Sequence, residues 1–171
     1  VYVLDLLNCG LKELPADVAK LKNCQRIYLY DNGFTSLPKE LFELEFLQEL
    51  HLDRNNLTKI PDEIGNLKNL KVLSIRNNQL SILTPQIGEL IKLEILLLSK
   101  NKLTTLPDEI CNCIALTQLH IDDNLLEYLP DNIGDLNNLM ELYAGKNELV
   151  DLPLSIGKLE LLNILYLDNN R

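Results

Sequence analysis

Residues 47–69 read LQELHLDRNNLTKIPDEIGNLKN, and the pattern of this stretch recurs along the chain with a period of 23 residues. Repeats start at residues 1, 24, 47, 70, 93, 116 and 139, and a partial eighth starts at 162. The period is clearest at frame position 9, counted from the start of each repeat. Asparagine occupies it at Asn32, Asn55, Asn78, Asn101, Asn124, Asn147 and Asn170. The period indicates one repeat domain over residues 1–171.

The physics of one repeat predicts a strand followed by a return path. In Leu50-His51-Leu52, apolar and polar residues alternate, so both leucines point into a core and the residue between them points out. Parallel neighbouring strands need a crossover, and residues 61–63 (Pro-Asp-Glu) are typical of the first turn of a short helix. We therefore expect every leucine of the frame to be buried. In the fourth repeat Thr84 replaces the proline and Pro85 follows, which predicts only a local change in the return.

The full frame, L-x-x-L-x-L-x-x-N-x-L-x-x-L-P-x-x-I-G-x-L, resembles the leucine-rich repeat family over the whole chain. Its length and its L-P-x-x-I-G-x-L ending are similar to the intracellular subclass, which includes Ras-group and Scribble-type scaffolds and similar bacterial proteins. The resemblance implies an α/β leucine-rich repeat solenoid, a right-handed horseshoe with a concave parallel sheet and short convex helices or turns. Solenoids need polar capping repeats. Neither end of the sequence shows one, so we expect a segment of a longer protein.

The asparagine ladder is interpreted as structural. An asparagine side chain offers two donors and an acceptor, which can satisfy backbone groups that a turn leaves unpaired. Cys9 occupies the same position in the first repeat, where a weaker hydrogen-bonding side chain is tolerable.

Composition excludes several classes of function. The 171 residues carry 25 acidic and 16 basic side chains, a formal charge of −9, which argues against a nucleic-acid partner. No apolar run approaches the ~18 residues that span a bilayer, so we expect no membrane insertion. His51 and His120 are three repeats apart, roughly 14 Å at the strand spacing, which is too far to share a metal or a proton. We therefore expect no catalysis, no metal site and no cofactor.

Cysteine usage bears on the compartment. Cys24 and Cys113 occupy leucine positions and Cys111 the usual glycine position, so these side chains are predicted to be free core thiols. Extracellular members of the family usually carry disulfide-bonded caps, and this sequence shows none. The cysteines therefore favour a cytoplasmic location. One sequon, residues 56–58 (Asn-Leu-Thr), points the other way, toward secretion.

Exposed positions of the predicted sheet are where binding information should lie. We define the concave face as frame positions 3, 5, 7 and 8, and it carries four of the six tyrosines and both histidines. Tyrosine is favoured at interfaces because it buries a large area with few torsions. The predicted partner-binding residues are Tyr28, His51, Val72, Arg76, Ile95, Leu97, His120 and Tyr143. Val72, Ile95 and Leu97 are expected to form a small exposed apolar centre. The alternative is that aromatic and β-branched residues simply favour strands.

These observations favour a protein-interaction scaffold or targeting module that binds a protein partner on its concave face and acts in signalling in the cytoplasm. Two alternatives stay open. One is an extracellular or secreted recognition or adhesion domain. The other is a bacterial protein, delivered to a host, that engages host proteins.

Overall fold

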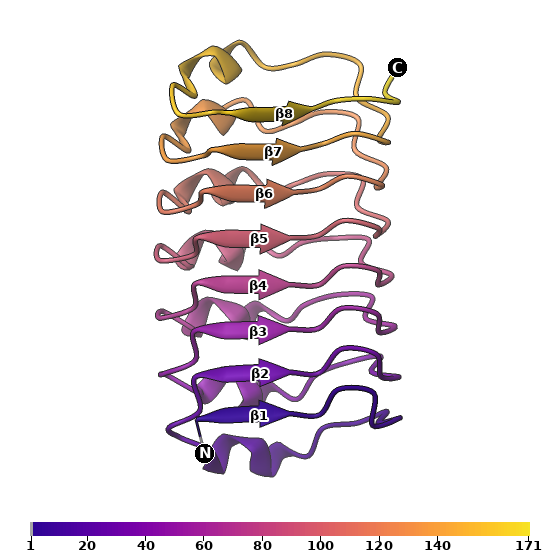
Figure 1. The fold of residues 1–171 in the computed structure, drawn as a ribbon, viewed down its shortest axis with the longest axis vertical. Helices are drawn as coiled ribbons and strands as arrows, with labels where there is room; N and C mark the ends of the chain where they lie inside the picture. Colours follow the sequence, from indigo (N-terminus) through magenta and orange to yellow (C-terminus); the bar gives the residue numbers. More distant parts are fainter. Residues whose placement is uncertain (1) are drawn as a thin grey trace.

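The computed structural model describes residues 2–171 as one parallel sheet of eight three-residue strands in sequential order (Figure 1). The strands are β1 (Val3–Asp5), β2 (Arg26–Tyr28), β3 (Glu49–His51), β4 (Val72–Ser74), β5 (Ile95–Leu97), β6 (Gln118–His120), β7 (Glu141–Tyr143) and β8 (Ile164–Tyr166). Every strand residue pairs with the strand residue 23 positions away, as Leu50 does with Ile27 and Leu73. The 23-residue strand spacing predicted from the sequence is confirmed.

The return paths are short 3-10 helices. They are η1 (Ala16–Lys20), η2 (Lys39–Glu43), η3 (Asp62–Asn66), η4 (Pro85–Glu89), η5 (Asp108–Asn112), η6 (Ile133–Asp135) and η7 (Leu154–Lys158). The return has room for about one tight turn, which suits the 3-10 geometry because such helices run only a few residues. Within residues 2–171, the helical elements of the predicted α/β class are therefore 3-10 helices rather than α-helices.

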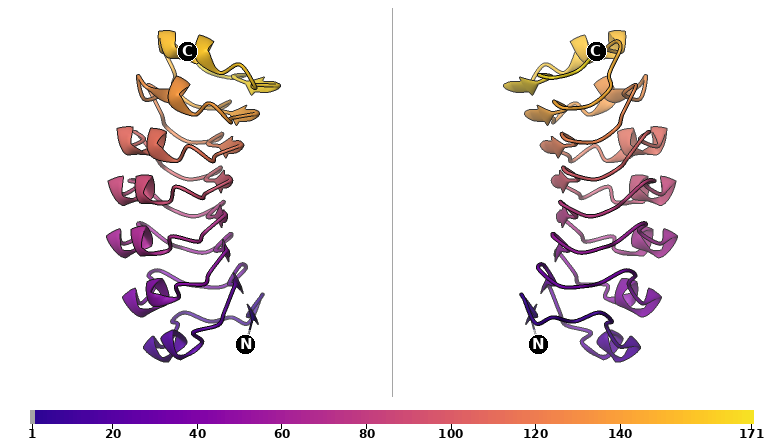
Figure 2. Two further views of the ribbon diagram at one scale, coloured as in Figure 1. Left: turned by 90° about the vertical axis from the view of Figure 1, so that its left-hand side faces the viewer. Right: turned by 90° about the vertical axis from the view of Figure 1, so that its right-hand side faces the viewer.

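The sheet and the helices form two sides of a gently curved stack. Figure 2 shows the strands along the inner side and the helices along the outer side, with the sheet left open at both ends. Neighbouring strands lie ~4.8 Å apart while the helical returns need more room, so the stack curves toward the sheet. The predicted leucine-rich repeat solenoid with a concave sheet is confirmed.

Burial follows the frame in the interior repeats and fails at the ends. Leu50, Leu73 and Leu96 are fully buried, and burial of one such side chain stabilises the fold by roughly 1.5–3 kcal/mol. Leu4, however, is half-buried and Leu165 is 41% exposed. The expectation that every frame leucine is buried is therefore wrong for the terminal repeats, because each of them has a neighbour on one side only. It is also wrong for Leu37 and Leu152 in the second and seventh repeats, which are half-buried.

The fourth return accommodates its displaced proline locally. Thr84 caps η4, its side chain accepts from the backbone N–H of Gln86 at 3.4 Å, and Pro85 becomes the first helical residue. The cap keeps φ −68° and ψ 142°, close to the −71° and 159° of Pro61 at η3. The predicted local change is confirmed.

The cysteines are free thiols in two environments. Cys9 is exposed, whereas Cys24, Cys111 and Cys113 are buried. Burial raises the pKa of Cys111 to about 11, with Asp108 adding to the rise, and burial raises the pKa of Cys113 to about 12. Because the thiolate is the reactive form, the buried cysteines should be inert in the folded protein.

Alkylation should therefore count the thiols in two steps. Under native, non-reducing conditions we expect a single adduct, at Cys9, in the intact mass. After denaturation, still without reductant, all four cysteines should react. A total of two adducts or none in the denatured sample would reveal a disulfide and would contradict the prediction of free thiols.

Candidate functional site

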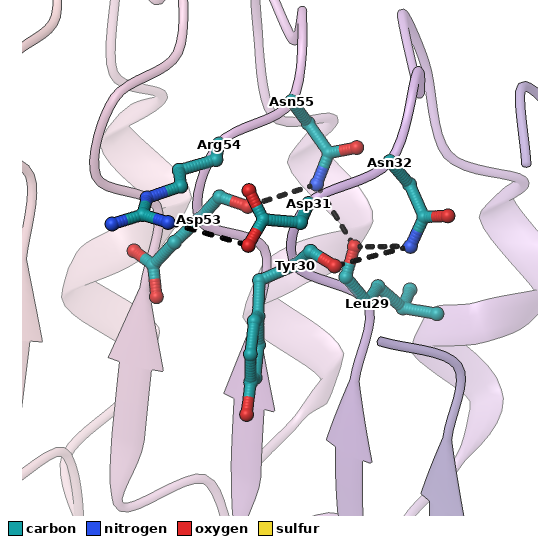
Figure 3. Close-up of polar contacts among 7 residues, drawn as sticks. All are labelled: Leu29, Tyr30, Asp31, Asn32, Asp53, Arg54 and Asn55. Carbon is teal, nitrogen blue, oxygen red and sulfur yellow. Dashed lines mark hydrogen bonds and ion pairs between the residues drawn. The ribbon is translucent and has the colours of Figure 1, made fainter. Parts of the chain in front are cut away.

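The turn that follows each strand is built by the asparagine ladder. Asn55 Nδ2 donates to the carbonyl oxygens of Leu52 and Leu29, each at 3.0 Å, and Asn55 Oδ1 accepts from the Phe34 N–H at 3.1 Å. Figure 3 shows Asn32 and Asn55 pointing at the same Leu29 carbonyl, so one carbonyl accepts from two successive repeats. The contacts support a structural role for the ladder.

The residue before each asparagine has a left-handed backbone. At frame position 8, φ lies between 51° and 59° in Asn8, Asp31, Arg54, Asn77, Lys100, Asp123, Lys146 and Asn169. Asparagine and aspartate tolerate this region best, and they occupy five of these eight positions. Position 8 belongs to the predicted concave face, but its left-handed turn was not predicted. The turn brings the position 8 side chains to the C-terminal ends of the strands.

The concave face contains a hollow of about 850 Å³ at these strand ends. It is lined by Tyr28, Tyr30, Asp31, His51, Asp53, Arg54, Arg76, Asn77, Ser99, Lys100, His120, Asp122 and Tyr143. Five of the predicted binding residues are among them, namely Tyr28, His51, Arg76, His120 and Tyr143.

The other three predicted residues lie differently. Val72, Ile95 and Leu97 are half-buried on the sheet rather than fully exposed, and they do not line the hollow. Strand side chains of this kind pack against their cross-strand neighbours, as Val72 opposite Ile95 illustrates. The apolar centre thus lies beside the hollow. The hollow is lined by positions 5, 7 and 8, and of its residues at positions 7 and 8 only Arg76 was predicted.

Aromatic rings pack in columns on both sides of the hollow. The ring planes are tilted by 37° in Tyr28–His51 and by 44° in His120–Tyr143, and they are stacked in Tyr143–Tyr166. The ring centroids of Tyr28 and His51 are 4.9 Å apart on β2 and β3. On β6 to β8, the His120 and Tyr143 centroids lie 4.3 Å apart and those of Tyr143 and Tyr166 lie 4.9 Å apart. The stacks arise because frame position 5 repeats every strand, which places these side chains in one column at the strand spacing.

Arg76, His120 and Glu141 lie close to one another on the concave face, and His120 Nε2 is buried without a hydrogen-bond partner. Arg76 Nη2 lies 3.4 Å from His120 Nδ1, and His120 Nε2 lies 3.6 Å from Glu141 Oε2. Burial lowers the pKa of His120, and the neighbouring Arg76 guanidinium lowers it further. Neutral His120 can accept from Arg76 on Nδ1 only while its proton is on Nε2, facing Glu141.

The chemistry available in the hollow is recognition by stacking, hydrogen bonding and charge. Within residues 2–171, no group of three or more His, Cys, Asp or Glu side chains could hold a metal ion. None of the helices in this described part of the chain is long and apolar enough to cross a membrane.

Comparison with known proteins identifies the class. A leucine-rich repeat family profile matches residues 45–88, and a second leucine-rich repeat profile matches residues 92–113. No curated protein sequence matches the chain. Together with the eight-stranded repeat fold, the profile matches show that this is a leucine-rich repeat protein.

Solved structures agree with this assignment. A leucine-rich repeat protein of Leptospira interrogans is 34% identical, with a TM-score of 0.81 over 95% of this chain and 47% of that one. The ectodomain of the plant receptor kinase GASSHO1/SCHENGEN3 from Arabidopsis thaliana, in complex with Casparian strip integrity factor 2, is 33% identical, with a TM-score of 0.88 over 99% of this chain and 21% of that one.

An internalin from Listeria monocytogenes shares the fold, with a TM-score of 0.90 and 22% identity over 100% of this chain and 48% of that one. The chain thus spans less than half the length of each of these three proteins.

Proposed function

We propose that this chain is a protein-interaction module, a scaffold or targeting unit in signalling, that binds a protein partner on its concave face. The observation that carries the proposal is the hollow of about 850 Å³, lined by Tyr28, His51, Arg76, His120 and Tyr143. Tyrosine and arginine are enriched at interfaces and dominate their binding energy. The ring stacks fix the tyrosine side chains before binding, which reduces the entropy lost on association.

A cytoplasmic location is part of this proposal. The three buried free cysteines are compatible with a reducing compartment, as is the similarity of the repeat frame to the intracellular subclass. The expectation that the chain is not an enzyme belongs to the same proposal, because the side chains of the hollow offer binding chemistry rather than an arranged nucleophile and base.

A second candidate is an extracellular or secreted recognition domain, or a bacterial protein that engages host proteins. Asn56, the acceptor of the sequon, is exposed and would be accessible to glycosylation. The similar structures include a plant receptor ectodomain and a Leptospira protein. A glycan at Asn56 in protein from the native source would favour this candidate over the cytoplasmic one.

Binding on the concave face can be tested by comparing how well the wild-type chain and matched variants capture the partner. Leu97→Glu combined with Tyr143→Ala places a charge beside the hollow and removes the middle ring of a stack. We expect binding to weaken by about 2 kcal/mol, roughly thirtyfold, because central aromatic anchors dominate interface energies. Proteins retained by the wild-type chain from a lysate of its source would be identified by mass spectrometry and their affinities measured.

The control is Glu109→Lys, on the exposed convex side of η5. It reverses a charge away from the sheet, so we expect a change of less than about 0.5 kcal/mol. Circular dichroism should show all variants folded. Loss of capture by Glu109→Lys, with capture kept by the concave double variant, would place the binding surface on the opposite side.

A further inference from the structure

The arginines of the chain differ in their partners, and the difference bears on the proposed function. Arg26 pairs with Glu49 at 3.1 Å, Arg54 pairs with Asp31 at 3.3 Å, and Arg171 pairs with Glu148. Arg76, the fourth arginine, forms no ion pair with any carboxylate in residues 2–171, although it lines the hollow.

The carboxylates that line the hollow already have partners. Asp31 is paired with Arg54. Asp53 Oδ1 accepts from Ser74 Oγ and from the Arg76 backbone N–H, both at 2.6 Å, and Asp122 Oδ1 accepts from Ser99 Oγ at 2.6 Å. These carboxylates therefore bind the turn and the serines rather than the Arg76 guanidinium.

A second cation without an ion pair lies one repeat further along. Lys100 lines the hollow on the repeat after Arg76, and it too forms no ion pair within the described part of the chain. Adjacent repeats are ~4.8 Å apart at the strands. The middle of the hollow thus has two cationic side chains whose charges no protein carboxylate directly offsets.

The guanidinium of Arg76 has unused hydrogen-bonding capacity. Of its five N–H donors, the contact in the structure is that of Nη2 with His120 Nδ1 at 3.4 Å, a long distance for a hydrogen bond. Arg76 Nε is buried without a hydrogen-bond partner. Such an unsatisfied donor is costly, and a planar carboxylate is the group whose geometry matches the guanidinium fork.

Resting on the proposed function, we propose that the partner presents a carboxylate to Arg76 and Lys100 in the hollow, between the Tyr28–His51 stack and the His120–Tyr143 stack. The surroundings favour a singly charged carboxylate over a phosphate. Asp31, Asp53 and Asp122 line the same hollow and repel a doubly charged anion more strongly. Flanking residues of the partner would contact the tyrosine rings.

The test uses random decapeptides displayed on phage and selected on the immobilised wild-type chain. We expect the enriched peptides to share an aspartate or glutamate at one position, or a required free C-terminus. The affinities of synthetic peptides would then be measured with the shared carboxylate present as the acid and with it replaced by its amide. On the wild-type chain the amide form should bind roughly tenfold more weakly, and on Arg76→Gln, where Lys100 alone remains, that difference should shrink to about threefold or less.

Three further variants extend the comparison. Lys100→Gln should reduce the preference for the acid form, whereas Lys146→Gln should leave it unchanged. Lys146 is the matched control because it has the same frame position and left-handed backbone, φ 51° against 59°, and is exposed outside the hollow. Arg76→Lys keeps the charge without the fork and should retain part of the preference, which guards against loss of folding in Arg76→Gln.

The outcomes separate this proposal from the proposed function. If the peptides share no acid, or if Arg76→Gln keeps the wild-type preference for the acid form, the carboxylate proposal is wrong. The concave face itself would still stand if Leu97→Glu with Tyr143→Ala abolished peptide binding. Peptide binding that survives all of these variants would contradict both proposals, whereas a selection that enriches no peptide would contradict the carboxylate proposal alone.

Discussion

Replacing Asn101 with leucine is expected to lower the free energy of unfolding by roughly 1–3 kcal/mol. The Asn101 side chain is buried, accepts from the Leu80 N–H at 3.0 Å, and donates to the carbonyls of Ile75 at 2.8 Å and Leu98 at 2.9 Å. Each carbonyl keeps one ladder partner, Asn78 for Ile75 and Asn124 for Leu98. The Leu80 N–H keeps none, and an orphaned buried donor carries most of the cost.

Urea unfolding followed by circular dichroism measures this loss. Asn56→Leu is the matched control, since Asn56 is exposed and directly follows a ladder asparagine. We expect the control to change stability by less than about 0.5 kcal/mol, as surface substitutions usually do. Equal midpoints for Asn101→Leu and the wild type would show that the ladder does not hold the turns.

Gly134→Ala is expected to destabilise the array by about 3 kcal/mol. A Cβ at Gly134 would overlap the carbonyl oxygen of Ser155 in the next return, and it would lie 3.0 Å from Ser155 Cβ. Backbone cannot move aside as a flexible side chain can. The η6 and η7 helices would therefore have to separate, which would also stretch the hydrogen bond from the Gly134 N–H to Ser155 Oγ.

Gly157→Ala tests this explanation at the same frame position. A Cβ at Gly157 would meet no heavy atom within 4 Å. We expect its thermal midpoint to stay within error of the wild type, while that of Gly134→Ala falls by several degrees. A comparable loss in both variants would mean that helix propensity or backbone freedom, rather than the close approach of the returns, explains the glycine.

The repeat fold could be predicted from sequence because each repeat forms the same strand, turn and return from residues close together in the chain. Alternation at Leu50 and Leu52, a turn closed by Asn55 and a return after Pro61 follow from short-range chemistry. The period then sets the register of every strand pair. Exposure of the end leucines, as at Leu165, depends on the missing neighbour rather than on the repeat itself.

The candidate site was less predictable. Selection by residue type identified the tyrosines and histidines. Position 5 recurs once on every strand, so its side chains form a column across the sheet. The selection missed Lys100, whose place in the hollow depends on the left-handed turn at position 8, and it missed Asp53 and Asp122 at position 7. The abundance of asparagine and aspartate at position 8 could have indicated the left-handed turn. The contact between Arg76 and His120, which spans two repeats, depends on side-chain conformations that no local pattern encodes.

The most direct test of concave-face binding is hydroxyl-radical footprinting of the chain with and without its captured partner. Tyr143 and Tyr166 lie in a ring stack on the sheet, whereas Tyr128 is 61% exposed away from the hollow and serves as the internal control. We expect the partner to slow oxidation of Tyr143 and to leave Tyr128 unchanged. Protection of Tyr128 with undiminished oxidation of Tyr143 would contradict binding on the concave face.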